Sequence, residues 1–296
     1  MGPASTFDQR VSARLDRMSP AERRVVHFFQ QNREEVLISS AAALAAKAET
    51  SDATVVRATK ALGFAGLDEL RRTLAAELRS SLSAADRLSR TLGEIGDDLQ
   101  AAFDVTLNIH VNALESLRRD INPEQFRAAV TRLVDARRVL VFGIGPSSAM
   151  AEYFVIQLAR FGLEAASLTR TGLLFADDLQ RLREGDLVII LAYGRVYREL
   201  AALLDKARKC GAGTILLTDT LAAALRRKVD QVLPVARGRA DMLSMHTATL
   251  GLIEALLVGI ATQRPRETLS SLKSLNDARE KLAGEPMSLP QGRFLK

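Results

Sequence analysis

Polar side chains that could contact DNA begin a short helix pattern at residues 51–62. Ser51, Asp52 and Thr54 are the short polar groups that a DNA-reading helix needs in its first turn, close to base edges and phosphates. Arg57 lies one turn after Thr54, so it shares a face with Ser51 and Thr54 and could pair bidentately with a guanine. Further cations are spaced to reach phosphates: Lys47, Lys60, Arg71 and Arg72. The segment is either a DNA-reading helix or part of a small helical bundle with a solvated polar face.

Glycines and serines that could hold an anion occur in the run FGIGPSS, residues 142–148, between a strand pattern and a helix pattern. Glycine lets the backbone approach an anion, and the N-terminus of the next helix presents free N–H groups. Gly145, Ser147 and Ser148 are the expected ligand residues. The run is not a dinucleotide fingerprint, because Ser148 stands where GxGxxG has glycine, and no lysine follows as in a Walker loop. A purely structural turn is the alternative.

Basic and aromatic residues follow the third strand pattern, at residues 192–199. In a doubly wound sheet this loop is expected to lie next to the first strand's turn. Arg195 or Arg198 could hold a phosphate or carboxylate bidentately, with Tyr193 and Gly194 in the same loop. Three residues after the second strand pattern could line the same crevice: Thr169, Arg170 and Thr171. The alternative is a set of solvated loop residues.

Composition limits the remaining possibilities. The chain has 296 residues, three histidines and one cysteine, Cys210, so no metal site, cofactor or internal disulfide is expected, and a reducing cytoplasm fits. The longest apolar run, residues 250–261, is too short to span a bilayer, and the polar, charged N-terminal segment is not expected to be a signal peptide. The formal net charge of +6 suits a polyanionic partner, but residues 1–80 carry 12 basic against 10 acidic side chains. Any DNA affinity must therefore come from where the basic residues are placed.

Two domains are expected to position these residues. Residues 1–80 predict an all-α helix-turn-helix domain, in which Leu44, Val55, Ala58 and Leu62 form the core side. Residues 81–120 predict a linker followed by a helix over 99–118. Five apolar strand patterns alternate with helix patterns in residues 121–262, which indicates a five-stranded parallel, flavodoxin-like sheet with helices on both faces. A final helix is expected over 241–262, and a tail, helical around 266–282, completes the chain.

The first domain resembles the N-terminal domain of RpiR-type transcriptional regulators. The run SSAAALAAKAETSDATVVRATKALGFAGLDELRRTLA carries the resemblance, and its most specific part is ATVVR followed by K-LGF-G and a leucine-rich helix. With the preceding MSPAERRVV segment, the similarity covers residues 5 to 80. The resemblance implies a domain that binds palindromic operator DNA as a dimer, with Ser51, Thr54 and Arg57 as groove contacts.

The second domain resembles a SIS domain, the sugar isomerase module of the same regulators. The runs that match are FGIGPSS, GDLVIILA, ELAALLDKARKCGAGTILLTD and VDQVLPV. The resemblance implies binding of a phosphorylated sugar through serines after the first and third strands. Ser147 matches the first set. At the second set Ala192 and Gly194 replace the serines when Arg198 and Glu199 are aligned with the family's basic-acidic pair.

The resemblance also draws attention to His246, because related modules place this region near a ligand. SIS isomerases transfer protons with glutamate and histidine, so Glu152 and His246 could form such a pair; structural roles are the alternative. The leading hypothesis is a ligand-responsive regulator of a carbohydrate or related catabolic operon. Its partners would be operator DNA, a small anionic effector and further copies in a dimer or tetramer, with no membrane. The alternatives are a sugar-phosphate isomerase and a SIS module that acts only in dimerisation.

Overall fold

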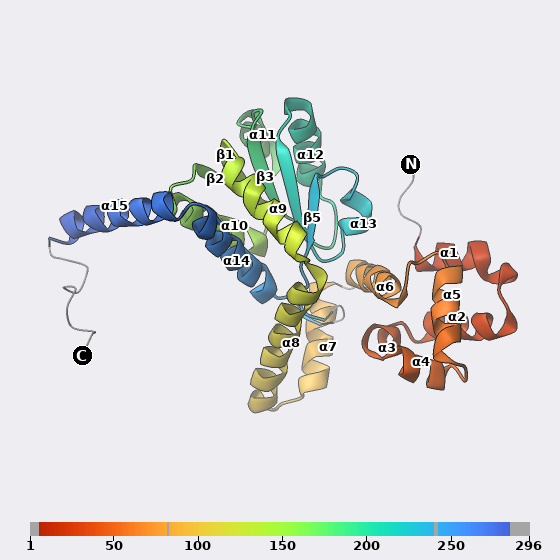
Figure 1. Ribbon diagram of the computed structural model, residues 1–296. Coiled ribbons are helices and arrows are strands. Elements are labelled where there is room, and N and C mark those ends of the chain that lie inside the picture. The colour runs from red at the N-terminus through yellow and green to blue at the C-terminus, as the bar shows by residue number, and fades with distance from the viewer. Residues whose placement is uncertain (1–5, 82, 240–241, 285–296) are drawn as a thin grey trace.

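The computed structural model describes residues 6–81, 83–239 and 242–284 and forms a helical domain followed by an α/β domain (Figure 1). The helical domain contains α1 (Phe7–Arg14), a 3-10 turn η1 (Leu15–Arg17), α2 (Pro20–Gln31), α3 (Arg33–Ile38), α4 (Ala41–Lys47), α5 (Asp52–Ala61) and α6 (Leu67–Ser81). Short capping motifs in the sequence define several of these helices. Ser19 and Glu22, for example, form a reciprocal capping box at the start of α2.

The pair α4 and α5 forms the expected helix-turn-helix. Ser40 caps α4 and Ser51 caps α5, each by accepting a backbone hydrogen bond from the residue three positions on. Glu49, in the turn between the helices, has a left-handed φ of 51°. The predicted core side is confirmed, because the four side chains assigned to it are fully buried: Leu44, Val55, Ala58 and Leu62.

The segment after this domain differs from the prediction. Residues 84–95 were expected to be linker and instead form the helix α7 (Ala84–Ile95), which precedes α8 (Leu99–Asp120) in a helical hairpin. Ser83 and Asp86 form a capping box that starts α7, and Gly96, with φ of 69°, ends it. The glycines and acidic residues of LGEIGDD therefore mark a helix end and a turn, while the apolar spacing before them is helical.

The α/β domain confirms the expected five-stranded parallel sheet, with strand order β2-β1-β3-β4-β5. Its strands are β1 (Arg138–Gly143), β2 (Ala165–Leu168), β3 (Asp186–Leu191), β4 (Gly213–Thr218) and β5 (Gln231–Pro234). Alternate strand residues pack on opposite faces: Val139 and Val141 join one hydrophobic cluster, and Leu140 and Phe142 join the other. The sheet is therefore buried on both sides.

Helices cover both faces of the sheet. The first cluster includes residues of α8, α9 (Pro123–Asp135), α10 (Pro146–Arg160) and α14 (Thr247–Gln263). The second includes residues of α11 (Phe175–Gln180), α12 (Arg198–Cys210) and α13 (Ala222–Leu225); the 3-10 turn η2 (Gly172–Leu174) precedes α11. The last described helix, α15 (Pro265–Ala283), projects from the body (Figure 1). No helix in the described ranges is long and apolar enough to span a membrane.

The predicted start of the final helix was wrong. Helix α14 begins at Thr247 rather than at residue 241, and residues 242–246 form a loop. The apolar pattern of this loop comes from Met242, which is buried, and Leu243, which lines a cavity described below. Apolar spacing alone could not distinguish such a buried loop from a first helical turn.

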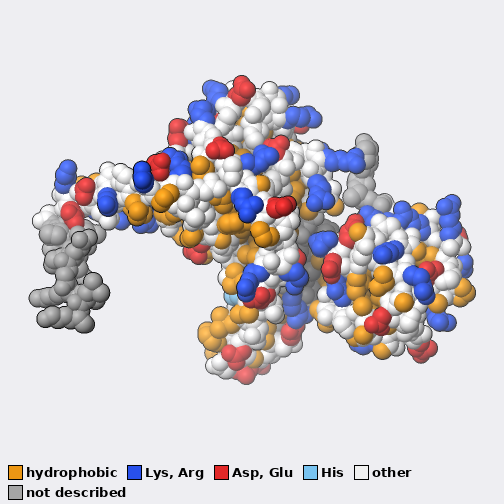
Figure 2. Space-filling view, viewed as in Figure 1, with side chains coloured by type: hydrophobic (Ala, Val, Ile, Leu, Met, Phe, Trp, Pro, Cys, Tyr) orange, Lys and Arg blue, Asp and Glu red, His pale blue; other side chains and the backbone are white. Residues whose placement is uncertain are grey.

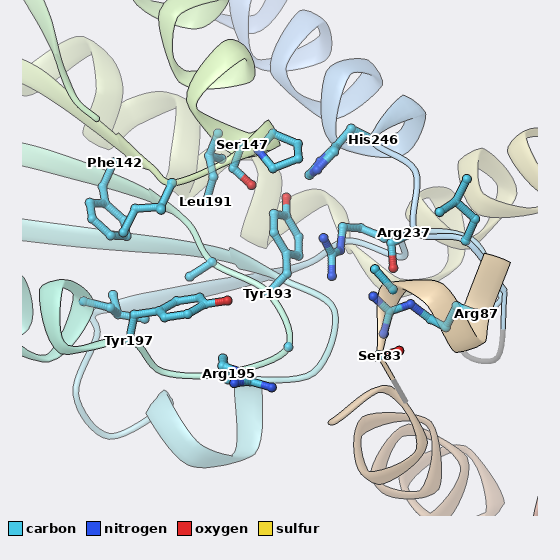
Figure 3. Close-up of a pocket in the computed structure, with 18 residues that line it drawn as sticks. Ser83, Arg87, Phe142, Ser147, Leu191, Tyr193, Arg195, Tyr197, Arg237 and His246 are labelled. Carbon is cyan, nitrogen blue, oxygen red and sulfur yellow. The ribbon is translucent and has the colours of Figure 1, made fainter. Parts of the chain in front are cut away.

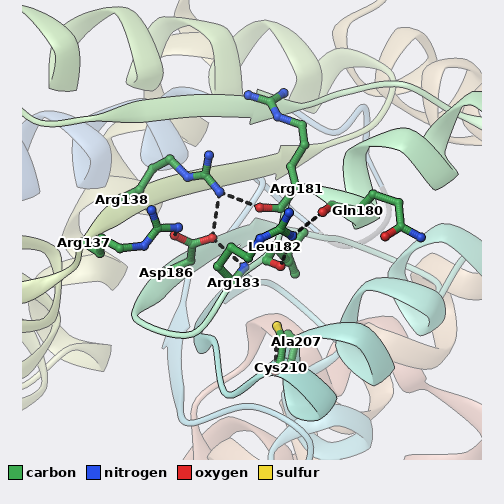
Figure 4. Close-up of polar contacts among 9 residues, drawn as sticks. All are labelled: Arg137, Arg138, Gln180, Arg181, Leu182, Arg183, Asp186, Ala207 and Cys210. Atoms are coloured by element: carbon green, nitrogen blue, oxygen red, sulfur yellow. Dashed lines mark hydrogen bonds and ion pairs between the residues drawn. The ribbon is translucent and has the colours of Figure 1, made fainter.

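A buried carboxylate joins β1 to β3 at the amino ends of these strands (Figure 4). The Asp186 side chain is fully buried and pairs with Arg137 at 2.5 Å and with Arg138 at 2.8 Å. The backbone N–H of Arg183 donates to the same carboxylate at 2.9 Å. The charge of Asp186 is thus compensated by two cations and a backbone donor, as burial requires.

Candidate functional site

The exposed face of α5 is the candidate DNA contact. Ser51, Asp52, Arg57 and Lys60 are exposed on this helix, as the sequence predicts. Thr54 is only 4% exposed, and its Oγ1 accepts a hydrogen bond from Nη2 of Arg57 at 3.0 Å. The Thr54 and Ser51 hydroxyls also lie 3.0 Å apart. Thr54 therefore holds the Arg57 side chain in place, and its hydroxyl is not presented to a ligand.

Two of the expected phosphate contacts have partners inside the helical domain. Lys47 Nζ lies 2.6 Å from Glu35 Oε1, although Lys47 remains half exposed. Arg71 donates through Nε to the backbone carbonyl of Val36 at 2.9 Å and through Nη2 to that of Ser39. Arg71 thus satisfies carbonyls at the end of α3. The sequence could not show this, because Arg71 and α3 meet only in the fold.

The candidate effector site is a cavity of about 480 Å³ at the carboxyl ends of β1 and β3 (Figure 3). From the predicted residues it receives Ser147, at the start of α10, then Tyr193, Gly194 and Arg195 after β3, and His246 before α14. These residues come from three segments far apart in the sequence. Their meeting follows from the parallel topology, which brings the carboxyl ends of neighbouring strands to one edge.

Tyr193 organises the floor of the cavity. It is 8% exposed, and its hydroxyl lies 2.8 Å from Thr249 Oγ1 in α14. The Arg237 guanidinium lies over its ring at 4.4 Å from the centroid. The His246 ring packs against it in a T-shaped arrangement, with the two ring centroids 5.5 Å apart. Burial raises the pKa of Tyr193 well above its ordinary value, so the phenol stays protonated. Figure 3 shows these three side chains grouped beside Ser147.

Charge in the cavity is provided by arginine and not by histidine. Burial lowers the pKa of His246, and the positive charge of Arg237 lowers it further, so the imidazole is neutral at pH 7. Arg237 is itself fixed by buried Asp219, with Nε and Oδ2 3.2 Å apart. Arg195 is exposed at the cavity edge. Arg87 of α7 also lines the cavity, so the arrangement combines neutral hydrogen-bonding groups with three arginines, which suits a polar anion.

The turn between β1 and α10 explains the FGIGPSS run. Gly145 has a left-handed φ of 61°, and a Cβ on Gly143 would collide with the backbone carbonyl of Ser147. Ser147 is 5% exposed and faces the cavity. Ser148 Oγ instead donates to the Gly145 carbonyl at 2.7 Å, so its hydroxyl stabilises the turn. Of the two serines, only Ser147 lines the cavity.

The structure does not bring the other predicted effector residues to this cavity. Arg170 pairs with Asp178 at 2.5 Å and with Asp177 at 3.4 Å. Thr169 donates to Glu152 at 3.3 Å. Thr171 and Arg198 are exposed, and neither lines the cavity. For the residues after β2 the reason is position in the sheet, because β2 lies at the edge beyond β1. Arg198 is exposed in the first turn of α12, where Tyr197 and Leu200 line the cavity and Arg198 does not.

Sequence reasoning missed several residues that line the cavity. Arg237 follows β5 and could have been found, because β5 ends at the same edge of the sheet. Arg87 belongs to α7, Ser83 is the N-cap residue of that helix, and Ser244 lies in the loop before α14. Nothing in the sequence links α7 to the sheet, because that contact depends on the path of the chain after α6. Glu152 and His246 are not brought together, since Glu152 does not line the cavity. The described residues contain no cluster that could hold a metal ion.

Two family models match the chain. Residues 6–81 match "Helix-turn-helix domain, rpiR family", and residues 132–259 match "SIS domain". The HTH-type transcriptional regulator HexR of Pseudomonas aeruginosa is 28% identical over 276 residues, covering 91% of this chain and 94% of HexR. The bifunctional protein glk of Burkholderia thailandensis is 28% identical over 268 residues, which is 89% of this chain. The chain spans only 41% of the length of that protein.

Solved structures agree with this arrangement. The sugar isomerase domain of an RpiR transcription factor from Sphaerobacter thermophilus is 28% identical, with a TM-score of 0.55 over 60% of this chain and 99% of that chain. The Vibrio vulnificus NanR protein, solved in complex with ManNAc-6P, shares the fold at 22% identity, with a TM-score of 0.56 over 94% of this chain and 99% of NanR. The chain is thus a two-domain protein with a helix-turn-helix domain and a SIS domain. Its helix-turn-helix domain is of the rpiR family.

Proposed function

We propose that the chain is a ligand-responsive transcriptional regulator that binds operator DNA in the cytoplasm and controls a carbohydrate or related catabolic operon. One observation carries the proposal. The cavity at the strand ends is lined both by the SIS domain and by Ser83 and Arg87 of α7, the helix that follows the helix-turn-helix domain. A ligand in this cavity would contact the connection between the two domains directly.

The helical domain supports the DNA-binding part of the proposal. The outer face of α5 presents Ser51, Asp52, Arg57 and Lys60 together, and Thr54 restrains Arg57 from beneath. An arginine fixed in this way loses less conformational freedom when it pairs with a guanine. Lys47, at the end of α4, can reach a phosphate if it leaves Glu35. Two copies of the chain would read the two halves of a palindromic operator.

The cavity supports a small anionic effector of the phosphosugar type. Arg195 and Arg237 supply positive charge, Ser147 supplies a hydroxyl, and α10 directs its N-terminus toward the same space. The solved NanR complex contains a phosphorylated sugar on the same fold, which supports this class of ligand. Ala192 and Gly194 stand where the family has serines after the third strand. We propose that arginines bind the phosphate in this chain instead.

We propose no catalytic role for the cavity. Sugar isomerisation needs an acid and a base at one carbon atom. His246 lines the cavity, but Glu152 lies outside it and accepts a hydrogen bond from Thr169. Tyr193, with its raised pKa, cannot replace the glutamate as a base near neutral pH.

A thermal-shift screen of phosphorylated sugars, sugar acids and amino sugars tests the effector site. We expect a phosphorylated sugar to raise the melting temperature of the wild type, because a ligand that binds only the folded state stabilises it by mass action. Arg195→Ala should lose most of this shift. Arg198→Ala removes the same charge three residues away, at a side chain that does not line the cavity. This variant should keep the ligand-induced rise in melting temperature. Equal shifts in the two variants would remove the cavity as the effector site.

Fluorescence anisotropy with DNA from upstream of the coding gene tests the DNA interface. We expect Arg57→Ala to weaken specific binding by about 10-fold or more, as the loss of one bidentate base contact does. Arg17→Ala removes an exposed arginine from η1 and therefore lowers the net charge by the same amount. Beyond the effect of that charge loss on both variants, Arg17→Ala should change the affinity for DNA by less than about 2-fold. Equal losses in the two variants would show that α5 does not read the operator.

A further inference from the structure

The two sides of the effector cavity differ in chemistry. Figure 3 shows Arg237 and Arg87 on one side of the Tyr193 ring, and Phe142 and Tyr197 on the other. The second side, called the apolar wall below, consists of six uncharged lining residues: Phe142, Ile144, Leu191, Ala192, Tyr197 and Leu200. The cavity is therefore amphipathic, and Figure 2 shows a surface of the molecule on which hydrophobic and charged side chains are likewise mixed.

Most of the apolar wall is part of the hydrophobic core. Phe142, Ala192 and Leu200 are at most 7% exposed and belong to the cluster on the α11–α12 face of the sheet. Ile144 packs against the same cluster. The Phe142 ring also packs on the ring of Phe175, with the two centroids 5.7 Å apart. Close packing fixes these side chains, so the wall has its shape before a ligand binds.

Tyr197 differs from the rest of the wall, because it is 50% exposed. Its ring contacts no other aromatic ring in the described part of the chain, so a face is available for offset stacking. Ala192 and Gly194, which precede it in the loop, have no side-chain hydroxyl. Apart from the phenol of Tyr197, the side chains of the wall offer a sugar hydroxyl no hydrogen bond, and burying such a group unpaired is unfavourable.

We infer that the apolar wall binds an aromatic group of the effector, which makes the effector a phosphorylated compound with an aromatic substituent and not an unsubstituted sugar phosphate. This ligand class rests on the proposed function, in which arginines of the cavity bind a phosphate. With the phosphate at the arginines, the rest of the ligand extends past Tyr193 to the wall. An aromatic group there removes apolar surface from water, which is favourable in proportion to the area covered. The volume of about 480 Å³ has room for such a ligand.

Isothermal titration calorimetry of the full chain with phenyl phosphate and glycerol 3-phosphate tests the inference. Both probes are phosphate monoesters, and only phenyl phosphate has an aromatic ring. We expect phenyl phosphate to bind at least 10-fold more tightly and with a more negative change in heat capacity, because it covers the wall. Phenyl phosphate that binds no more tightly than glycerol 3-phosphate, or not measurably, would overturn the inference.

Two neighbouring variants assign the preference to the wall. Tyr197→Ala removes a half-exposed side chain that the core does not need, and it should lower the ratio of the two affinities at least 5-fold. Val196→Ala shortens the adjacent exposed side chain, which does not line the cavity, and should keep the wild-type ratio. Equal ratios in the two variants would show that the wall does not bind the aromatic ring.

Arg195→Ala separates a failure at the apolar wall from a failure of the proposed function. We expect this variant to weaken the binding of both probes by a similar factor and to keep their ratio, because both carry the phosphate that the arginines attract. If the wild type binds both probes equally and this variant weakens both, the arginines bind phosphate as proposed and only the apolar wall is wrong. Unchanged affinities for both probes would overturn the arginine site and the inferred ligand class together.

Discussion

At the scale of single residues, the cavity keeps its histidine neutral and its tyrosine protonated while arginines supply the charge. The cause is burial combined with the guanidinium of Arg237, which faces Tyr193 and disfavours a second cation on His246. The Asp219 carboxylate is paired with Arg237, which compensates its positive charge. A ligand entering this site therefore meets hydrogen-bonding groups whose protonation does not change around neutral pH.

The lowered pKa of His246 predicts a loss of stability in mild acid. The folded state resists protonating this imidazole, so its contribution is fully present above pH 6.5, the ordinary histidine pKa, and is lost as the pH falls below it. We expect His246→Gln to lose less stability than the wild type between pH 7.5 and 5.5 in urea denaturation. His27→Gln, at an exposed histidine, should follow the wild type. An identical loss of unfolding free energy in all three proteins would show that the pKa of His246 is not lowered in the folded state.

At the scale of elements, the turn from β1 into α10 is the most constrained part of the site. Gly143 and Gly145 allow α10 to begin against the strand end, which places Ser147 in the cavity and turns Ser148 onto the backbone. The two serines are adjacent in sequence but differ in role because of this turn. The backbone conformation of this turn thus determines which serine hydroxyl faces the cavity.

Replacing Gly143 with alanine should therefore damage the domain. The new Cβ would collide with the Ser147 carbonyl, so we expect a loss of about 3 kcal/mol in the free energy of unfolding, in the range of severe overpacking. Gly66→Ala is the control, because a Cβ there meets no atom within 4 Å. Urea denaturation followed by circular dichroism measures both. A Gly143→Ala variant as stable as the control would contradict the described turn.

At the scale of the whole molecule, α7 is the element through which the two domains can influence each other. It follows α6 after a short gap, lines the cavity and is tied to the loop before α14. A second tie joins Arg239 to Glu94 at 2.7 Å. A ligand that closes this loop against α7 would shift the helix relative to the helix-turn-helix domain, which is what coupling between two sites requires.

Thr91→Val should weaken that coupling without removing either binding site. The substitution keeps the side-chain shape but leaves the Leu243 N–H without its acceptor. We expect the phosphosugar with the largest thermal shift to change operator affinity about 5-fold less in this variant than in the wild type. Thr106→Val, on α8, is the control. Anisotropy with and without the sugar measures the ratio, and an unchanged ratio would exclude this route.

The sequence predicted the elements well where one local pattern decides them. The alternating strand patterns, the Ser19 capping box and the core positions of α5 all depend on neighbours within a few residues. The missed α7 had a usable signal, the Ser83–Asp86 capping box, which the glycines and acidic residues after it obscured. The early start predicted for α14 failed because buried apolar loops and helices share the same composition.

The site was harder to predict because its residues meet only in three dimensions. Ser147, Tyr193 and Arg195 could be inferred from strand ends, since parallel topology gathers them. In the sequence, Arg170 and Arg71 look equally able to bind a phosphate. In the structure, Arg170 pairs with carboxylates, and Arg71 donates hydrogen bonds to backbone carbonyls. Ser83 and Arg87 could not be inferred at all, because nothing local places α7 beside the sheet.

The buried Asp186 cluster has a consequence for how this protein reaches its fold. Arg138 stands opposite Asp186 in the pairing of β1 with β3, and both strands are otherwise uniformly apolar. Apolar strands alone specify register weakly, because shifting by two residues still buries similar side chains. A shift by two residues, however, would move Arg138 away from Asp186 and leave the buried carboxylate without that cation. The cluster therefore disfavours folding intermediates in which β1 and β3 pair in the wrong register. Because the register of β1 and β3 also positions the residues at their carboxyl ends, the cluster helps to align the cavity there.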